Sequence, residues 1–185
     1  MPVTVHTFQE LKNQKKTFAC LTAYNYSFAK IIDQTGIPLI LVGDSFGMVE
    51  QGLTSTIPVT LNSMIEAGKA VTRGCRNVFV VIDMPFMTCG INPEQDLLQI
   101  KKVMQETGAN GIKIEGAGEN ILQTIQKTTA LGIPVLGHIG LTPQYINTLG
   151  NFAIQGKTNM QAEILEQQAT KLEQVKRTTE AGRGI

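Results

Sequence analysis

The sequence contains no hydrophobic run that could cross a membrane. Its longest apolar run, around Ile37 to Val42, is far shorter than the roughly 20 residues that span a bilayer. It also has no block of basic residues, and its formal net charge is +1. We therefore expect neither a membrane nor a nucleic acid as a partner. No apolar segment follows the first residues in the manner of a secretory signal, so we expect a soluble, cytoplasmic protein.

Cysteine is scarce, and several well-known motifs are absent. The three cysteines are Cys20, Cys75 and Cys89, with no CxxC pair among them, so neither a disulfide framework nor a thiolate zinc site is indicated. We expect these thiols to be buried or incidental. The dinucleotide-binding pattern GxGxxG does not follow the first apolar run, and no phosphate-binding GxxxxGK[ST] occurs.

The sequence does contain five short apolar runs that alternate with amphipathic stretches. The runs are 18–24, 38–44, 78–84, 111–116 and 134–140, and the helical stretches lie near 27–35, 61–73, 92 onward, 119–131 and 160 onward. This alternation predicts a parallel sheet covered by helices, either doubly wound or a (β/α)8 barrel. We expect one domain over residues 1–185. A full barrel needs about 250 residues, so five βα units are fewer than a complete barrel.

Polar residues recur where the apolar runs end. In both architectures, chemistry takes place at the carboxyl ends of the strands. Charges at such places are costly unless they are paired or bind a metal. Together these positions predict a converging active site; they are Asp44 and Ser45, Asp83, Lys113 and Glu115, and His138.

Each position has a simpler interpretation when it is taken alone. Asp44 and Asp83 could be turn residues, which is a common use of aspartate. Lys113 could form a structural pair with Glu115 or another carboxylate, since lysine is rarely buried without a partner. His138 could be a satisfied core histidine. The coincidence of all of them at strand ends favours the functional interpretation.

The residue types suggest a particular chemistry. Carboxylates without cysteine ligands suit a hard divalent ion such as Mg²⁺. A lysine beside the ion would neutralise a developing oxyanion, and a histidine could bind a carbonyl or carboxylate. This set suits the formation of an enolate from a 2-oxo acid.

A series of motifs then resembles one family. TAYNYSFAK, LVGDSFGM, TIPVT, DMPFM, GIKIEG, GHIGLTPQ and GNFAIQGK occur in this order, and the series closely resembles the ketopantoate hydroxymethyltransferase family over about residues 8–165. The resemblance implies a (β/α)8 barrel that binds Mg²⁺ and forms a homo-oligomer. It also implies transfer of a hydroxymethyl group from 5,10-methylenetetrahydrofolate to 3-methyl-2-oxobutanoate. The product is 2-dehydropantoate, in pantothenate biosynthesis.

The resemblance also assigns roles to the residues at the strand ends. Asp44 and Asp83 look like metal ligands that position the oxo acid, and Glu115 looks like the third metal-site carboxylate, acting through water. Ser45 and Lys113 look like substrate contacts, and His138 looks like the partner of a substrate oxygen. Lys113 and His138 are thereby the expected catalytic residues. The loop 150–157 resembles the family's mobile segment over the site.

The sequence departs from the family at its C-terminal end. The family's proton-abstracting glutamate lies in a Leu-Glu-Cys-Val-Pro type motif on a sixth strand, and no such motif occurs here. Residues 180–182 fall where a helix would end just before that strand. Two hypotheses follow: the transferase itself, or an inactive truncated fragment that keeps the metal and oxo-acid half-site. A third, another enolate-forming barrel such as a 2-oxo-acid lyase, is disfavoured by the motif series. Five strands would leave open edges, so we expect the chain to associate or to be poorly soluble.

Overall fold

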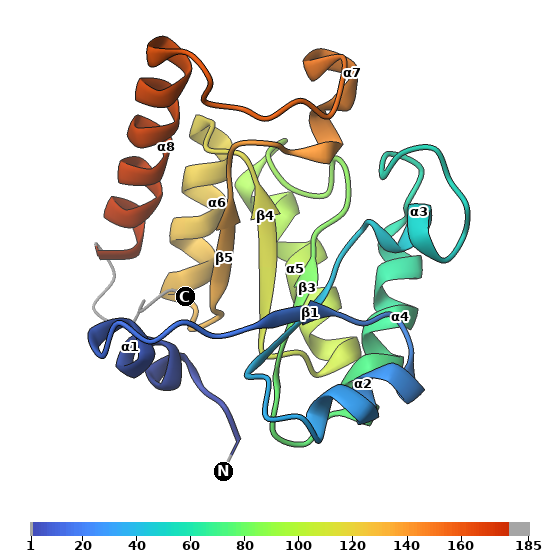
Figure 1. Ribbon diagram of the computed structural model, residues 1–185. Coiled ribbons are helices and arrows are strands. Elements are labelled where there is room, and N and C mark those ends of the chain that lie inside the picture. Colours follow the sequence, from blue (N-terminus) through green and yellow to red (C-terminus); the bar gives the residue numbers. More distant parts are fainter. Residues whose placement is uncertain (1, 178–185) are drawn as a thin grey trace.

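A computed structural model describes residues 2–177, and its centre is a five-stranded parallel sheet. The strands pair in chain order, and helices cover the outside of the sheet (Figure 1). The strands are β1 (Cys20–Thr22), β2 (Leu39–Val42), β3 (Phe79–Asp83), β4 (Gly111–Glu115) and β5 (Val135–His138). All five lie inside the apolar runs that predicted them.

The helices also agree with the sequence pattern, with additions. The predicted helices are α2 (Tyr26–Asp33), α4 (Leu61–Gly74), α5 (Pro93–Thr107), α6 (Glu119–Ala130) and α8 (Asn159–Arg177). The pattern did not predict four others: α1 (Val5–Asn13), α3 (Phe46–Val49), the 3₁₀ helix η1 (Pro143–Tyr145) and α7 (Ile146–Leu149). Three of these four are one turn long, and such elements carry too few residues to show a period.

Local signals explain where α5 begins and ends. The Asn92 side chain accepts hydrogen bonds from the backbone N–H groups of Glu94 and Gln95, and Pro93 occupies the first turn. Gly108 ends the helix in the left-handed conformation, with φ of 68°, which glycine adopts without a steric penalty.

Strand order decides between the two architectures that the sequence allowed. A doubly wound sheet reverses its strand order and carries helices on both faces. Here the order is sequential, and α2, α4, α5, α6 and α8 each pack against the next helix in one outer layer. The fold is therefore α/β of the (β/α)-barrel type. That the barrel is cut short after five units stays a prediction.

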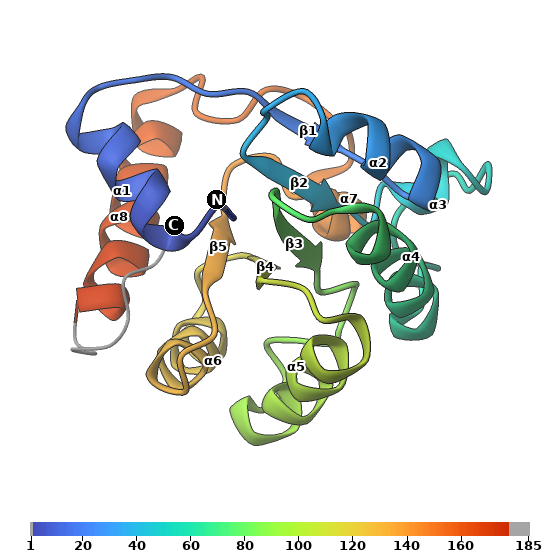
Figure 2. The same ribbon diagram turned by 90° about the horizontal axis from the view of Figure 1, so that it is seen from below.

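The main apolar core lies between the sheet and its outer helices, and a smaller apolar cluster lies on the inner face of the sheet. Leu39, Phe79 and Val81 line it, and Phe8 of α1 packs against Phe79 edge to face, with ring centroids 5.4 Å apart. Seen from below in Figure 2, α1 lies across the side where the curved sheet is open, near α8. Helix α1 therefore covers the amino end of the inner face, and the carboxyl end carries the polar residues.

Strands β1 and β5 each have one strand neighbour within residues 2–177. All three residues of β1 are exposed, and Leu21 is 44% exposed. The association predicted for such edges stays a prediction. Within the same described range, none of the helices has the length and apolar character needed to cross a membrane.

Candidate active site

Strand register brings the predicted residues together. Asp83 at the end of β3 pairs directly with Lys113 on β4, and Glu115 at the end of β4 pairs directly with His138 on β5. Directly paired residues of a parallel sheet point to the same face. All four side chains therefore lie on the inner face, at the carboxyl edge of the sheet.

Lys113 is the cation of this edge. Its Nζ donates to both oxygens of Asp83, at 2.7 and 2.8 Å, and lies 3.6 Å from Oε1 of Glu115. The lysine and both carboxylates are buried. The sequence left open whether Lys113 pairs with Glu115 or with another carboxylate. The structure shows that its hydrogen-bonded partner is Asp83.

His138 binds the second carboxylate. Its Nδ1 lies 2.8 Å from Oε1 of Glu115. An ionised carboxylate only accepts hydrogen bonds, so this contact favours the tautomer with hydrogen on Nδ1 and leaves Nε2 as an acceptor. The His138 side chain is 29% exposed. It is therefore not the buried core histidine of the alternative interpretation.

Asp44 completes the cluster from the end of β2. Its backbone N–H donates to Oδ2 of Asp83 at 3.3 Å, and its own Oδ2 accepts from Nε2 of Gln144 at 2.8 Å. Burial, and then the charge of Asp83, raise the pKa of Asp44 to about 7. Burial also raises the pKa of Asp83, against the opposing effect of the Lys113 ammonium. Asp44 is thus part of the cluster rather than only a turn residue.

The cluster carries more negative than positive charge. The carboxylates of Asp44, Asp83 and Glu115 interact with one another and with the single ammonium of Lys113. Full ionisation with a neutral His138 would leave two negative charges without a partner. Because buried charge is costly, the site favours either protonation of Asp44 or a bound cation.

The donor set suits a hard divalent cation with few protein ligands. Among residues 2–177, no three His, Cys, Asp or Glu side chains already converge as a metal centre. Mg²⁺ does not need such a cage, since it commonly binds one or two carboxylates and keeps water and substrate oxygens as its other ligands. Asp44 and Asp83 are adjacent and belong to a cluster whose three carboxylates outnumber its one ammonium, so they fit this requirement.

Two residues of the site were missed by sequence reasoning. Tyr24, just after β1, has its hydroxyl 3.0 Å from Oγ of Ser45. Gln144, in η1, contacts Asp44 as described above. Both lie inside motifs that carry the family resemblance, TAYNYSFAK and GHIGLTPQ. Tyr24 ends the first apolar run but carries no charge, and Gln144 lies beyond the end of the fifth run, so the search for charged groups at strand ends did not find them.

Gly43 keeps the ends of β2 and β3 close. A Cβ at this position would lie 3.0 Å from Oγ of Ser45 and 3.6 Å from Oδ2 of Asp83. A side chain here would displace Ser45 or intrude on the carboxylates. Glycine is therefore the residue that lets these two groups face the same space.

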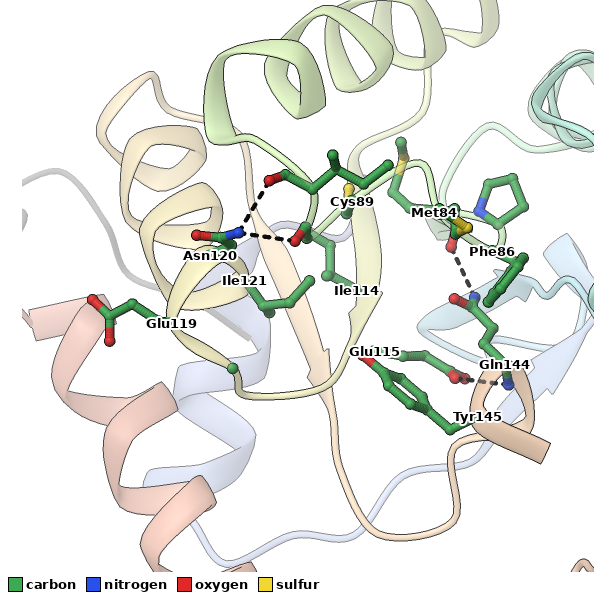
Figure 3. A pocket seen from close by; sticks show the side chains of 15 residues that line it. Met84, Phe86, Cys89, Ile114, Glu115, Glu119, Asn120, Ile121, Gln144 and Tyr145 are labelled. Carbon is green, nitrogen blue, oxygen red and sulfur yellow. Dashed lines mark hydrogen bonds between the residues drawn. The ribbon is translucent and has the colours of Figure 1, made fainter. Parts of the chain in front are cut away.

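A cavity of about 490 Å³ adjoins the cluster and shares Glu115 and Gln144 with it. Figure 3 shows Phe86, Ile114, Ile121 and Tyr145 around this cavity, with Asn120 at its far side. The Asn120 amide donates to the carbonyls of Gly90 and Ile91, which ties the loop after β3 to the start of α6. The cavity therefore has a largely apolar wall beside a polar cluster.

The cysteines are free: Cys75 and Cys89 are partly buried, and Cys20 is exposed, so Cys20 is incidental rather than buried.

The loop 150–157 runs from α7 to α8 on the side of the sheet where the strands end (Figure 1). Residues 180–182, where a helix was expected to end, lie outside the described residues.

Comparison with solved structures supports the fold. A crystal structure of phosphonopyruvate hydrolase in complex with oxalate and Mg²⁺ matches with a TM-score of 0.69 at 12% identity, over 94% of this chain and 60% of that chain. A 2,3-dimethylmalate lyase of the PEP mutase/isocitrate lyase superfamily matches with a TM-score of 0.62 at 13% identity, over 94% and 60%. At such identities the likeness extends to the fold alone.

Sequence comparison identifies the family. The 3-methyl-2-oxobutanoate hydroxymethyltransferase of a Dehalococcoides mccartyi strain is 48% identical over 94% of this chain, and that of a Bacillus cereus strain is 43% identical over 95%. The chain spans 61% and 60% of the length of these two relatives. The family described as ketopantoate hydroxymethyltransferase matches residues 2–176. This chain therefore belongs to the ketopantoate hydroxymethyltransferase family.

Proposed function

We propose that the chain serves the transfer of a hydroxymethyl group from 5,10-methylenetetrahydrofolate to 3-methyl-2-oxobutanoate, which gives 2-dehydropantoate for pantothenate synthesis. The observation that carries the proposal is the buried cluster of three carboxylates, one lysine and one histidine at the carboxyl edge of the sheet. Family membership supplies the substrates. The cluster supplies a place where an oxo acid and a divalent cation can be held together.

In this proposal Asp44 and Asp83 hold Mg²⁺, and Glu115 reaches it through water. The related fold of phosphonopyruvate hydrolase, crystallised with oxalate and Mg²⁺, supports a metal and a small dicarboxylate in this kind of barrel. When bound, the ion polarises the oxo and carboxylate oxygens of the substrate and makes the adjacent C–H bond more acidic. The uncompensated negative charge of the cluster favours a dication over a monovalent ion.

Side chains of this chain would bind the substrate and stabilise the charge that develops on it. The Lys113 ammonium, fixed by Asp83, lies where it can neutralise negative charge that develops on the substrate's oxo oxygen. With Nδ1–H of His138 on Glu115, Nε2 would donate to a substrate oxygen only in the imidazolium form, and Ser45, held by Tyr24, donates to the substrate's carboxylate. Strand register prearranges Lys113 and His138, and the contact with Tyr24 holds Ser45, so binding requires little reorganisation.

The folate co-substrate needs a surface of its own beside the oxo acid. We place its flat ring in the cavity next to Glu115, because Phe86 and Tyr145 offer aromatic surface there. We further propose that the protein forms a homo-oligomer in the cytoplasm and has neither a nucleic acid nor a membrane as a partner.

A second candidate function is binding without turnover. The motif that carries the family's glutamate base is absent from this sequence, and the chain spans about 60% of the length of its relatives. In this alternative the chain binds the metal and the oxo acid but does not remove the proton at C3. Proton NMR of 3-methyl-2-oxobutanoate in deuterated buffer with Mg²⁺ separates the two. Exchange well above the metal-only control supports catalysis, and none supports binding alone.

Calorimetry tests the site itself. Titration of 3-methyl-2-oxobutanoate should show binding that depends on Mg²⁺, and Asp83→Ala should abolish it, because one of two proposed metal ligands is lost. Asp83→Asn keeps the shape and should weaken binding by removing the charge. Asp33→Asn, at the opposite edge of the sheet, is the control and should bind normally. Unchanged Mg²⁺-dependent affinity in Asp83→Ala would contradict the assignment.

A further inference from the structure

Gln144 connects three strand ends of the site. Its Nε2 donates to Oδ2 of Asp44 at 2.8 Å and to the carbonyl of Met84 at 2.9 Å, and its backbone N–H donates to Oε2 of Glu115 at 3.3 Å. Asp44 follows β2, Met84 follows β3 and Glu115 ends β4. A residue that follows β5 thereby ties together the other three strands of the site.

The hydrogen bonds of the Gln144 side-chain amide fix its orientation. An NH₂ group has two hydrogens, and here both are used, one on a carbonyl and one on a carboxylate. The Met84 carbonyl belongs to the backbone and does not rotate, so it fixes the direction of the second N–H bond. That direction sets the orientation of the Asp44 carboxylate. Gln144 is itself buried, at 8% exposure, so water cannot easily replace it.

We propose that Gln144 is a positioning residue, which holds the Asp44 carboxylate in the orientation that binds a divalent cation. This inference rests on the proposed metal site. With Oδ2 of Asp44 held by Gln144, Oδ1 is the oxygen left to face a cation beside Asp83. Hydrogen bonds to ligating carboxylates commonly affect metal affinity about 10- to 100-fold, although they do not touch the metal.

The structure offers a matched control in Asn120. Its amide also donates two hydrogen bonds, at 3.2 and 3.0 Å, but both go to backbone carbonyls of the loop after β3. Figure 3 shows both amides beside the same cavity. Gln144→Met and Asn120→Leu each replace an amide by an apolar side chain of similar size and remove two hydrogen bonds. They differ in whether a carboxylate of the cluster loses a donor.

The experiment measures Mn²⁺ binding to the 185-residue chain by electron paramagnetic resonance, and thermal melting without metal. We expect Gln144→Met to lower Mn²⁺ affinity about 10- to 100-fold. Asn120→Leu should bind Mn²⁺ like the wild type. Gln144→Asn keeps the amide but is one methylene shorter, so it should give an intermediate loss, and it provides the test if Gln144→Met does not fold.

The possible outcomes separate this inference from the function on which it rests. Wild-type Mn²⁺ affinity in a folded Gln144 variant overturns the positioning role and leaves the metal site standing. Equal losses in the Gln144 and Asn120 variants, each with lowered melting temperature, also overturn it, because the effect would then be general. Failure of the wild-type chain to bind Mn²⁺ overturns both the inference and the proposed metal site.

Discussion

The two edges of the sheet use aspartate in opposite ways. At the amino edge, Oδ1 of Asp33 accepts hydrogen bonds from the backbone N–H groups of Arg76, Asn77 and Val78, at 3.0, 2.8 and 3.1 Å. Burial, slight here, acts to raise the pKa of Asp33, but these hydrogen bonds outweigh it and lower the pKa. At the carboxyl edge, Asp44 is buried beside another carboxylate and its pKa is raised to about 7.

This difference separates a stabilising role from a functional one. Asp33 is satisfied by neutral donors and fastens the end of α2 to the chain that enters β3. The cluster of Asp44, Asp83 and Glu115 keeps an unbalanced charge at the cost of stability, which is common where a protein binds ligands. In a barrel, residues at the amino edge usually serve stability and residues at the carboxyl edge serve chemistry.

The largest expected effect comes from removing the cation of the carboxyl edge. Lys113→Met leaves Asp83 and Glu115 buried without their ammonium, so the metal-free protein should lose about 3–5 kcal/mol of unfolding free energy. Mg²⁺ should restore part of it. Urea denaturation with and without Mg²⁺ measures both.

Lys69 provides the control for Lys113. It also lies between two carboxylates, Glu66 at 2.9 Å and Glu106 at 3.0 Å, but at the surface. Lys69→Met should therefore cost far less stability than Lys113→Met, with no response to Mg²⁺. Similar losses in the two variants would remove the distinction between the buried cluster and an ordinary surface pair.

The second prediction concerns pH and Asp44. A raised carboxyl pKa means that, between about pH 4 and pH 7, the folded chain holds a proton that the unfolded chain has lost. Stability therefore falls as pH rises through this window. Asp44→Asn removes the ionisation, so at pH 8 the metal-free variant should be more stable than the wild type, by up to about 4 kcal/mol.

The same variant should exceed the wild type in stability by much less at pH 5 than at pH 8, because at pH 5 only the lower part of this window has been crossed. Melting curves at the two pH values give the comparison. Addition of Mg²⁺ at pH 8 should stabilise the wild type more than the variant, because asparagine keeps a ligand oxygen but not the charge. A variant that is less stable than the wild type at pH 8 without metal would show that the ionised Asp44 carboxylate does not destabilise the folded chain.

The smallest effect is expected at the amino edge. Asp33→Ala deprives three backbone N–H groups of their acceptor, but water can reach them, so the loss should be about 1–2 kcal/mol. Binding of Mg²⁺ and of the oxo acid should not change. Calorimetry that showed weakened binding in this variant would mean that the two edges are coupled through the sheet.

The contrast between the edges was only partly visible in the sequence. Asp83, Lys113, Glu115 and His138 stand at the ends of apolar runs, so the pattern predicted that they lie at one edge of the sheet. The spacing of two residues placed Lys113 and Glu115 on one face. Their pairing could not be predicted, because it depends on register: Asp83 lies opposite Lys113, and Glu115 opposite His138.

Gln144 and helix α1 could not be predicted from the apolar pattern, for different reasons. Gln144 reaches Asp44 from a one-turn helix, and so short an element leaves no periodic signal. Helix α1 is long enough to show a helical period, but its only buried residue is Phe8, so its apolar pattern is weak. Such elements are fixed by tertiary contacts rather than by local propensity.

The sequential strand order has a consequence for how the protein is made. Each strand pairs with the one synthesised just before it, so the sheet can grow as the chain leaves the ribosome. The contact between Asp44 and Gln144, in contrast, joins residues 100 positions apart. During synthesis, Asp44 and Asp83 are present long before the glutamine that orients one of them. The nascent sheet therefore passes through a stage in which it carries its acidic edge but not yet the complete site.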